Sequence, residues 1–432
     1  MPQLFLPLLA RNPLAANDQI QKKGTIAVHY HRFDPVLTSG PDYSGKARQL
    51  NVTASVENIA VEEGAPAVPR IRDELSQWEV LALFFFTCLL FLVTVNLLSP
   101  NFLRLVDNFG DSSAYMSVAW AIRHWDFRGL AVKQFWGLPY TMAMVSSITG
   151  ISDRASLLVV CGISSLVTVI LAYQLWGGWV AALFLALNFD WIQRSFLGGA
   201  EPLFMALLLA GFVAVRRGRS MIGATLFSLA TLVRPLGVLA LIGIGTELLL
   251  LREFRKCAVA ASIGSVIALL YVLPLSYYFG NPFLNITKYS HSDWQTGSPL
   301  ALPFSAIIKG TSFREPWTNL SLTFGWIALV LAGAICIAAN KRCRQYANKH
   351  RSEVIFFFIY VIFLFTYNSP AWARGSFPRF AIPVLPFAIL GVLLWVPRSR
   401  LLLWSVSGIS ATLAGASAIG IRNVMQIILQ RV

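Results

Sequence analysis

Long apolar segments, separated by short polar or basic stretches, make up most of the chain after residue 77. About 20 apolar residues in helical form cross a hydrocarbon core of about 30 Å. Because lipid offers no partners to backbone polar groups, helices alone are expected there. The segments cover residues 80–98, 155–173, 179–196, 202–215, 221–232, 236–251, 258–279, 320–339, 354–367, 380–396 and 401–421, with a weaker one at 135–151. This pattern predicts an all-α polytopic membrane protein with about eleven transmembrane helices.

Residues 1–77 show no sustained hydrophobic period and mix proline, glycine and both charge signs. Such a composition is typical of segments with too little apolar surface to form a core. We predict a mostly disordered cytoplasmic N-terminal tail over 1–77, with a short strand near residues 25–30. The transmembrane domain then covers 78–421, and residues 422–432 form a short C-terminal tail.

The composition favours a membrane location over nucleic-acid binding. Hydrophobic residues make up 56% of the chain and charged residues 13%, whereas a soluble domain carries about 25% charged residues. The net charge of +15 comes from Lys and Arg in short clusters between apolar segments. Such clusters set topology and contact lipid headgroups. We expect membrane lipids as partners, no nucleic acid, and a location in a cell's inner membrane or, in a eukaryote, in the endoplasmic reticulum membrane.

Basic clusters predict which loops face the cytoplasm. They lie at residues 216–219, 252–256, 341–351 and 398–400. Counting helices between them places residues 101–154, 198–202, 280–319 and 368–379 on the external side. The weaker segment at 135–151 should then lie in the interface or enter the membrane only partway.

Residues 220–251 lie between two of these clusters and therefore predict a helical hairpin, with Arg234-Pro235 at its apex. Its first arm, 220–233, spans about 21 Å at 1.5 Å per residue, less than the hydrocarbon core. Arg234 should then lie in a protein-lined cavity, where a charge is costly and often functional. The alternative is a side chain that extends to the interface.

Two carboxylates, Asp107 and Asp111, follow the first apolar segment and lie four residues apart. Gly110 favours a loop that leads into a helix over about 114–126. This helix carries Tyr115 on an apolar stripe and is expected to lie flat in the outer interface. Asp111 is suited either to cap this helix or to act as a general base with a pKa raised by apolar surroundings.

The predicted external loop at 368–379 carries Arg374 and Arg379 around a Ser-Phe-Pro turn. Two guanidinium groups in one short loop suit a phosphate or diphosphate group. The alternative is anchoring in the outer interface, to which the neighbouring Trp372 would also contribute.

The other long external loop contains His291, Trp294 and Gln295. Aromatic faces and amide donors are useful for lining a sugar site. A packed or solvated histidine is the alternative for His291.

The motifs of several enzyme classes are absent. The chain contains no P-loop, GxGxxG, HExxH or GxSxG motif, which argues against nucleotide hydrolysis, zinc-protease and serine-hydrolase chemistry. Its five cysteines form no CxxC pair, so no metal site is predicted. No cofactor is required, although Asp107 and Asp111 could hold a divalent cation. Acids are scarce within the apolar segments, and a coupled transporter would need them.

Four stretches together resemble the GT-C superfamily, integral-membrane glycosyltransferases that use polyprenyl-phosphate sugars. They are Gly110-Asp-Ser-Ser-Ala-Tyr115, Gly199-Ala-Glu201-Pro-Leu-Phe, Ala230-Thr-Leu-Val-Arg234-Pro-Leu-Gly237 and Ser376-Phe-Pro-Arg379-Phe-Ala-Ile-Pro383. The middle two are similar to a block in the PIG-V-like mannosyltransferases, the protein mannosyltransferases and the aminoarabinose transferases. The resemblance covers about residues 78–400.

The resemblance implies Asp111 as the catalytic carboxylate, Glu201 as a sugar or acceptor contact, and Arg374 or Arg379 at the lipid phosphate. The expected function is transfer of a hexose such as mannose from a polyprenyl-phosphate donor to a hydroxyl of a lipid, glycan or protein acceptor, outside the cytoplasm. Asp107 would assist Asp111, and Arg234 would join the phosphate-binding residues. A transporter or flippase of lipid-linked sugars, or a non-catalytic membrane scaffold, is the alternative.

Overall fold

The computed structural model describes residues 74–420 apart from 100, 129, 131–132, 286, 289–298, 312–316 and 369–376. By its backbone contacts the chain divides into two units, Met1–Pro66 and Ala67–Val432, and every described residue belongs to the second. The predictions of a disordered tail up to residue 73, a strand near 25–30 and a tail at 422–432 lie outside the described residues.

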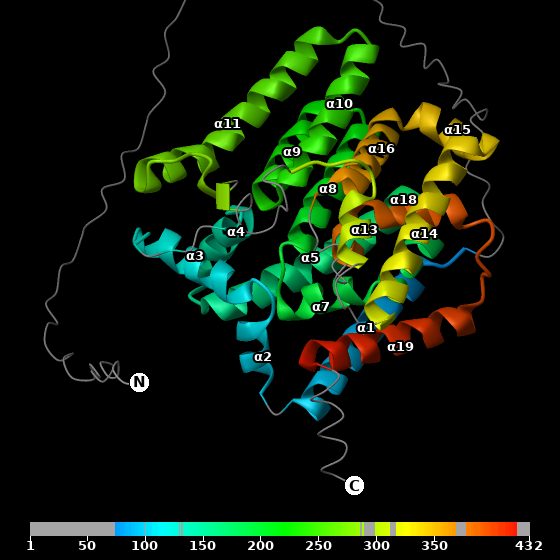
Figure 1. The fold of residues 1–432 in the computed structure, drawn as a ribbon, viewed down its shortest axis with the longest axis horizontal. Coiled ribbons are helices and arrows are strands. Elements are labelled where there is room, and N and C mark those ends of the chain that lie inside the picture. The colour runs from blue at the N-terminus through cyan, green and yellow to red at the C-terminus, as the bar shows by residue number, and fades with distance from the viewer. Residues whose placement is uncertain are drawn as a thin grey trace, which may run out of the picture. The chain divides into compact units, whose positions relative to one another are not determined.

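Within the described residues every regular element is helical, as predicted, apart from an isolated bridge between Leu300 and Tyr367. The α-helices (Figure 1) are α1 Gln77–Leu98, α2 Phe102–Asn108, α3 Ser112–His124, α4 Gly137–Thr149, α5 Asp153–Trp176, α6 Gly178–Leu187, α7 Phe189–Leu197, α8 Glu201–Arg216, α9 Ser220–Val233, α10 Val238–Leu250, α11 Phe254–Phe279, α13 Ser305–Thr311, α14 Trp317–Ala339, α15 Lys341–Lys349, α16 Arg351–Thr366, α17 Phe377–Ala381, α18 Leu385–Val392 and α19 Arg400–Ile419. Two 3-10 turns, η1 Pro235–Gly237 and η3 Ile382–Val384, precede α10 and α18.

Four described helices, α1, α5, α11 and α19, are long and apolar enough to cross a membrane. Serine side chains cap three of them: Ser76, Ser152 and Ser399 each accept a hydrogen bond from a backbone N–H of the first turn, which satisfies a donor that the helix itself cannot. Up to six spans result if α7 with α8, bent by 107°, and 323–339 with 343–349, bent by 80°, each count as one. The number eleven stays a prediction, since several expected spans are helices of 10–17 residues.

The predicted segment at 179–196 is wrong as a single helix, because the helix breaks at Asn188. The backbone of Asn188 is extended and its side-chain oxygen accepts a hydrogen bond from the Trp191 amide at 3.0 Å. This cap ends α6 and starts α7 as a separate helix. The segment at 380–396 is interrupted as well, by η3. Pro383 in η3 and Pro386 in the first turn of α18 both lack the N–H that a continuous helix needs.

Helices distant in sequence pack side by side in the second unit. The pairs with the most extensive contacts are α1 with α19, α5 with α8, α10 with α16, and α14 with α18, and the consecutive helices α8 and α9 also pack together. Between α8, α9, α16 and α18, the ring of Phe212 lies 5.0 Å from Phe227, 5.5 Å from Phe356 and 6.1 Å from Phe387, measured between centroids. Such aromatic contacts stabilise a helical core beyond the apolar area they bury.

The predicted hairpin at 220–251 matches α9 and α10, which contact each other on either side of Arg234 and η1. The first arm is the 14-residue helix α9, about 21 Å long at 1.5 Å per residue. The expected short segment at 135–151 is the 13-residue helix α4, which packs on α3, α5 and α9.

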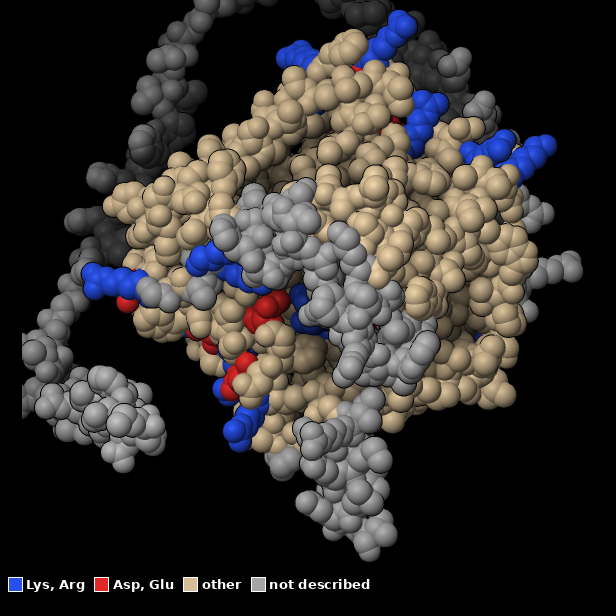
Figure 2. Space-filling view, viewed as in Figure 1, with Lys and Arg blue, Asp and Glu red and all other residues tan. Residues whose placement is uncertain are grey.

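Several of the basic clusters lie on one edge of the second unit. In Figure 2, Lys and Arg side chains gather over the α10–α11 turn and α15, whereas most visible Asp and Glu side chains lie near α2 and α3. Arg216, predicted only as a topology signal, bonds both carboxylate oxygens of the buried Glu353 at 2.5 and 2.8 Å. Tyr346 donates to the same carboxylate, so α8, α15 and α16 are held together at this edge.

Candidate functional site

The candidate site is a cluster of charged side chains around Glu201, the first residue of α8. Glu201 is completely buried. Its Oε1 accepts a hydrogen bond from Arg234 Nη1 at 3.0 Å and another from Arg379 Nε. A buried carboxylate is stable only when paired, and here two arginines pair with it. The chain therefore brings together three of the predicted residues, from the start of α8, the α9–η1 turn and α17.

Arg234 and Arg379 are fixed by more than this carboxylate. Arg234 is the extended residue that ends α9, and its guanidinium lies 5.2 Å from the centre of the Phe380 ring. Arg379 lies 5.8 Å from the same ring. Only 11% of the Arg234 side chain is exposed, which fits the predicted protein-lined location and not a side chain extending to the interface.

Asp111 lies at the exposed edge of the cluster. It occupies the N-cap position of α3, but its side chain makes no capping hydrogen bond, so the capping interpretation is wrong. Its carboxylate instead accepts from Arg379 Nη2 and from Gln134 Nε2, each at 3.4 Å. Arg379 thus bridges Asp111 and Glu201. With 38% of its side chain exposed, against 1% for Glu201, Asp111 is the more accessible of these two carboxylates.

Tyr115 lies one turn into α3 and is buried. Burial raises the pKa of its phenol, and the negative charges of Asp111 and Glu201 raise it further. The side chain is therefore a neutral wall beside these carboxylates. At the start of the same helix, the Ser112 hydroxyl donates to the Leu197 carbonyl at 3.2 Å, which joins α3 to the end of α7.

Asp107 has a different partner from the rest of the predicted site. Arg154 bonds both of its carboxylate oxygens, Nε to Oδ1 at 2.6 Å and Nη2 to Oδ2 at 2.5 Å. This bidentate ion pair links α2 to α5. Within the described part of the chain, no group of three His, Cys, Asp or Glu side chains is placed to hold a metal ion.

Sequence reasoning named neither Arg194 nor Asp190 as a site residue; both lie on α7. Arg194 is buried, with its guanidinium 4.7 Å from the centre of the Phe109 ring. Its Nε and Nη1, the Asp190 Oδ2 and the Glu201 Oε2 are buried and make no hydrogen bond among the described residues. The available signal was a polar stretch, Asp190 to Ser195, inside an apolar segment, since charges within spans mark functional sites.

Two glycines leave the space that Arg194 occupies. A Cβ atom on Gly110 would lie 2.5 Å from Arg194 Nη1, and one on Gly199 would lie 2.6 Å from Arg194 Cδ. Gly110 also has φ +53°, a conformation that costs other residues about 1–2 kcal/mol. The turn that presents Asp111 therefore passes directly over the arginine.

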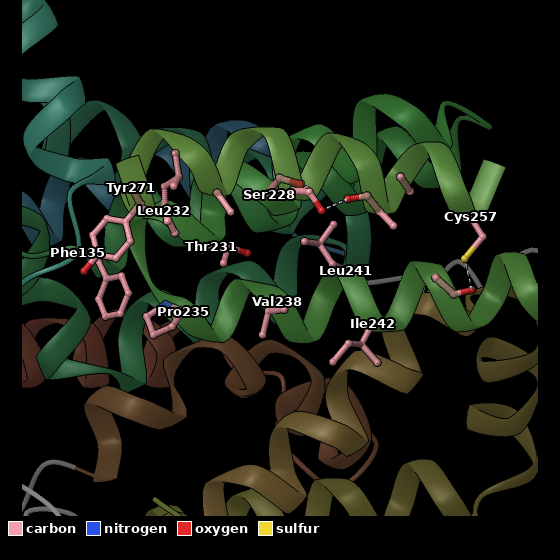
Figure 3. A pocket seen from close by; sticks show the side chains of 17 residues that line it. Phe135, Ser228, Thr231, Leu232, Pro235, Val238, Leu241, Ile242, Cys257 and Tyr271 are labelled. Carbon is pink, nitrogen blue, oxygen red and sulfur yellow. Dashed lines mark hydrogen bonds between the residues drawn. The ribbon is translucent and has the colours of Figure 1, made fainter. Parts of the chain in front are cut away.

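An apolar cavity of about 460 Å³ lies between α9, α10 and α11. Figure 3 shows Phe135, Tyr271 and Pro235 at one end of it and Cys257 at the other. The hydroxyls of Ser228 and Thr231 on its wall donate to carbonyls one turn back, at 2.7 and 2.9 Å. Their donors are thereby used within α9, which leaves the cavity wall mostly apolar.

The cavity begins beside the charged cluster. Gln134 donates to Asp111, and the next residue, Phe135, lines the cavity. Arg234 donates to Glu201, and the next residue, Pro235, lines the cavity. Charged and apolar regions thus meet at two places in the chain.

Four predicted site residues, His291, Trp294, Gln295 and Arg374, lie outside the described residues, as does Trp372. Comparison of the chain with family models, characterised proteins and solved structures finds no match. The described residues thus form a helical membrane protein with a buried carboxylate–arginine cluster, and residues that follow two members of its network in sequence line an apolar cavity.

Proposed function

We propose that the chain is a membrane glycosyltransferase of the GT-C type, which transfers a hexose such as mannose from a polyprenyl-phosphate donor to an acceptor hydroxyl. One observation carries the proposal: the arginine-rich cluster adjoins the apolar cavity at Gln134-Phe135 and Arg234-Pro235. A substrate with an anionic head and a long apolar tail fits both regions at once. Soluble nucleotide sugars would use only the first.

Small side chains on α11 leave room for a lipid chain. Ala260, Ala261, Gly264 and Ala268 line one wall of the cavity, and only 17% of the apolar window of α11 is buried. The cavity can therefore open toward lipid along this helix. A prenyl chain in it would place its phosphate near Arg234.

In the proposed reaction the acceptor oxygen attacks the anomeric carbon of the sugar, and the bond from that carbon to the phosphate oxygen breaks. Asp111 accepts the hydroxyl proton and becomes neutral. The lipid phosphate leaves with its charge changed from −1 to −2, so the total charge is conserved. Arginines near the leaving group stabilise this growing charge.

In this proposal the protein has about eleven spans and its site lies on the external side. The acceptor is a lipid, a glycan or a protein. Asp107 supports Asp111 through the α2–α3 region, and the reaction needs no metal.

The test uses purified protein in liposomes with a defined polyprenyl-phosphate mannose, and it measures loss of donor and formation of polyprenyl phosphate. The assay compares donors with several different sugars and several different acceptors. A nucleotide sugar is the negative control. Transfer from the lipid donor supports the proposal. Donor that crosses the bilayer without being consumed would instead identify a flippase.

A groove variant tests the role of the cavity. Gly264→Phe should fill it and raise the KM for a long-chain donor at least tenfold, with little effect on a short-chain analogue. Val266→Phe is the matched control, since Val266 is 64% exposed on the same helix and does not line the cavity. Equal effects of both substitutions would contradict the assignment of the cavity to the lipid chain.

A further inference from the structure

We propose that Arg194 binds the phosphate group of the substrate, and that Glu201 keeps Arg234 and Arg379 largely occupied. This inference rests on the proposed function and deepens it. Both of those arginines already donate to Glu201. By contrast, Arg194 Nε and Nη1 make no hydrogen bond to any described residue, although both atoms are buried.

Buried donors without partners are costly, because each loses its water and gains nothing in return. Nε and Nη1 lie on different edges of the guanidinium, so each can donate to a separate acceptor, and the oxygens of a phosphate are suitable acceptors for such charged donors. Arg194 is therefore held ready for an anion that the unliganded protein does not supply.

The surroundings of Arg194 place this anion next to the proposed base. Phe109 supports one face of the guanidinium at 4.7 Å. The Gly110 backbone lies so close to Nη1 that a Cβ there would come within 2.5 Å of it. Asp111 follows Gly110 directly. A phosphate on Arg194 would thus lie close to Asp111. The proposed reaction needs this closeness, because the base and the leaving phosphate act on one sugar.

The charges of the unliganded site are balanced. Three arginines, Arg194, Arg234 and Arg379, face three carboxylates, those of Asp111, Glu201 and the nearby Asp190 on α7. Proton transfer to Asp111 would remove one negative charge just as the phosphate gains one. Because Arg194 Nε and Nη1 make no hydrogen bond to a described residue, a phosphate can accept from them without breaking an existing hydrogen bond.

A purely structural role for Arg194 would be neutralisation of Asp190, four residues earlier on the same helix. The two roles differ in what Asp190→Asn does. If Arg194 only neutralises Asp190, the substitution should disturb the site as much as Arg194→Gln. If Arg194 binds phosphate, Asp190→Asn removes a nearby negative charge and should keep or tighten phosphate binding.

The experiment measures binding of farnesyl phosphate, farnesol and inorganic phosphate to the full-length protein in detergent. Arg194→Gln should weaken farnesyl phosphate binding about 10- to 100-fold, the range for loss of hydrogen bonds to a charged group, and should leave farnesol unchanged. Arg123→Gln is the matched control, because Arg123 pairs with Asp153 at 2.8 Å, outside the cluster. Arg194→Lys, which keeps the charge but loses the planar fork, should give an intermediate loss.

Arg194-dependent binding of inorganic phosphate alone would keep the anion site and assign it to a free phosphate compound. Equal losses for farnesyl phosphate and farnesol, no loss at all, or no phosphate binding by the wild type would overturn the inference. If neither Arg194 variant folds, a structure of the wild type with farnesyl phosphate decides, by whether the phosphate contacts Arg194. Sugar transfer is measured separately. If phosphate binding depends on Arg194 but no sugar is transferred, the proposed function is wrong and the anion site stands.

Discussion

Replacing Glu201 by glutamine tests whether the charged cluster is held by one buried carboxylate. Glutamine keeps the shape of the side chain but removes its charge. Glu201 accepts from both Arg234 and Arg379, and its side chain is 1% exposed. The substitution leaves two guanidinium groups close together, near a third on Arg194, with no carboxylate between them.

The expected loss of stability follows from these exposures. Removing one partner of a buried ion pair costs about 3–5 kcal/mol. Because 20% of the Arg379 side chain is exposed and water can partly screen it, the lower end, about 3 kcal/mol, is expected. Glu79→Gln is the matched control: Glu79 pairs with Arg400 at 2.8 Å, with 37% and 54% of the two side chains exposed. An exposed pair contributes less than about 1 kcal/mol.

Reversible unfolding of the detergent-solubilised variants by a denaturant measures both losses. A double variant, Glu201→Gln with Arg234→Met, should recover part of the loss, because it removes one of the charges left without a partner. If Glu201→Gln is no worse than Glu79→Gln, or if the second substitution only adds to the damage, the reasoning about the cluster is refuted.

Two further predictions concern other parts of the fold. Gly110→Ala should lower the Tm more than Gly150→Ala. Both glycines have positive φ, but only at Gly110 would the new methyl group meet Arg194. Equal shifts in Tm would contradict the close approach of Gly110 to Arg194. Burial, together with the nearby charge of Arg216, lowers the pKa of His350 to about 4. The unfolded chain, with an ordinary pKa near 6.5, then binds more protons, so stability should fall as the pH drops from about 6.5 to 4. Denaturant titrations across this range should show a smaller fall in His350→Gln, and an equal fall would contradict the shift.

The local pattern of the sequence was sufficient to place many helices. The segments predicted at 202–215 and 221–232 are α8 and α9, each within two residues at either end. The length of the α9 arm also placed Arg234 in a protein-lined site, because 14 helical residues are too short to cross the hydrocarbon core. These inferences depend only on residues close in sequence.

The breaks within apolar segments were not predicted, because hydropathy averages over many residues. The segment at 179–196 is apolar on average, yet Asn188 caps a new helix within it. The same averaging concealed Arg194, which lies among apolar residues of the segment. Whether short apolar helices cross a membrane depends on how they pack, which their composition does not determine.

The pairing of the site residues could be expected only in part. Sequence reasoning placed Glu201, Arg234 and Arg379 on one face, but the contacts join residues 33 and 178 positions apart. Such contacts depend on how the helices pack together. The partner of Asp107, Arg154, is 47 positions away and was not predicted for the same reason.

In the proposed reaction Asp111 removes a proton from the acceptor while a lipid-linked sugar is transferred. The most direct test is the single-turnover rate of sugar transfer from polyprenyl-phosphate mannose, in Asp111→Asn and in the control Asp126→Asn. Asp126 is an exposed acid just after α3. We expect a loss of about 10²–10⁴-fold for Asp111→Asn, with donor binding retained, and little change for the control. Transfer at the wild-type rate by Asp111→Asn would contradict the proposed reaction.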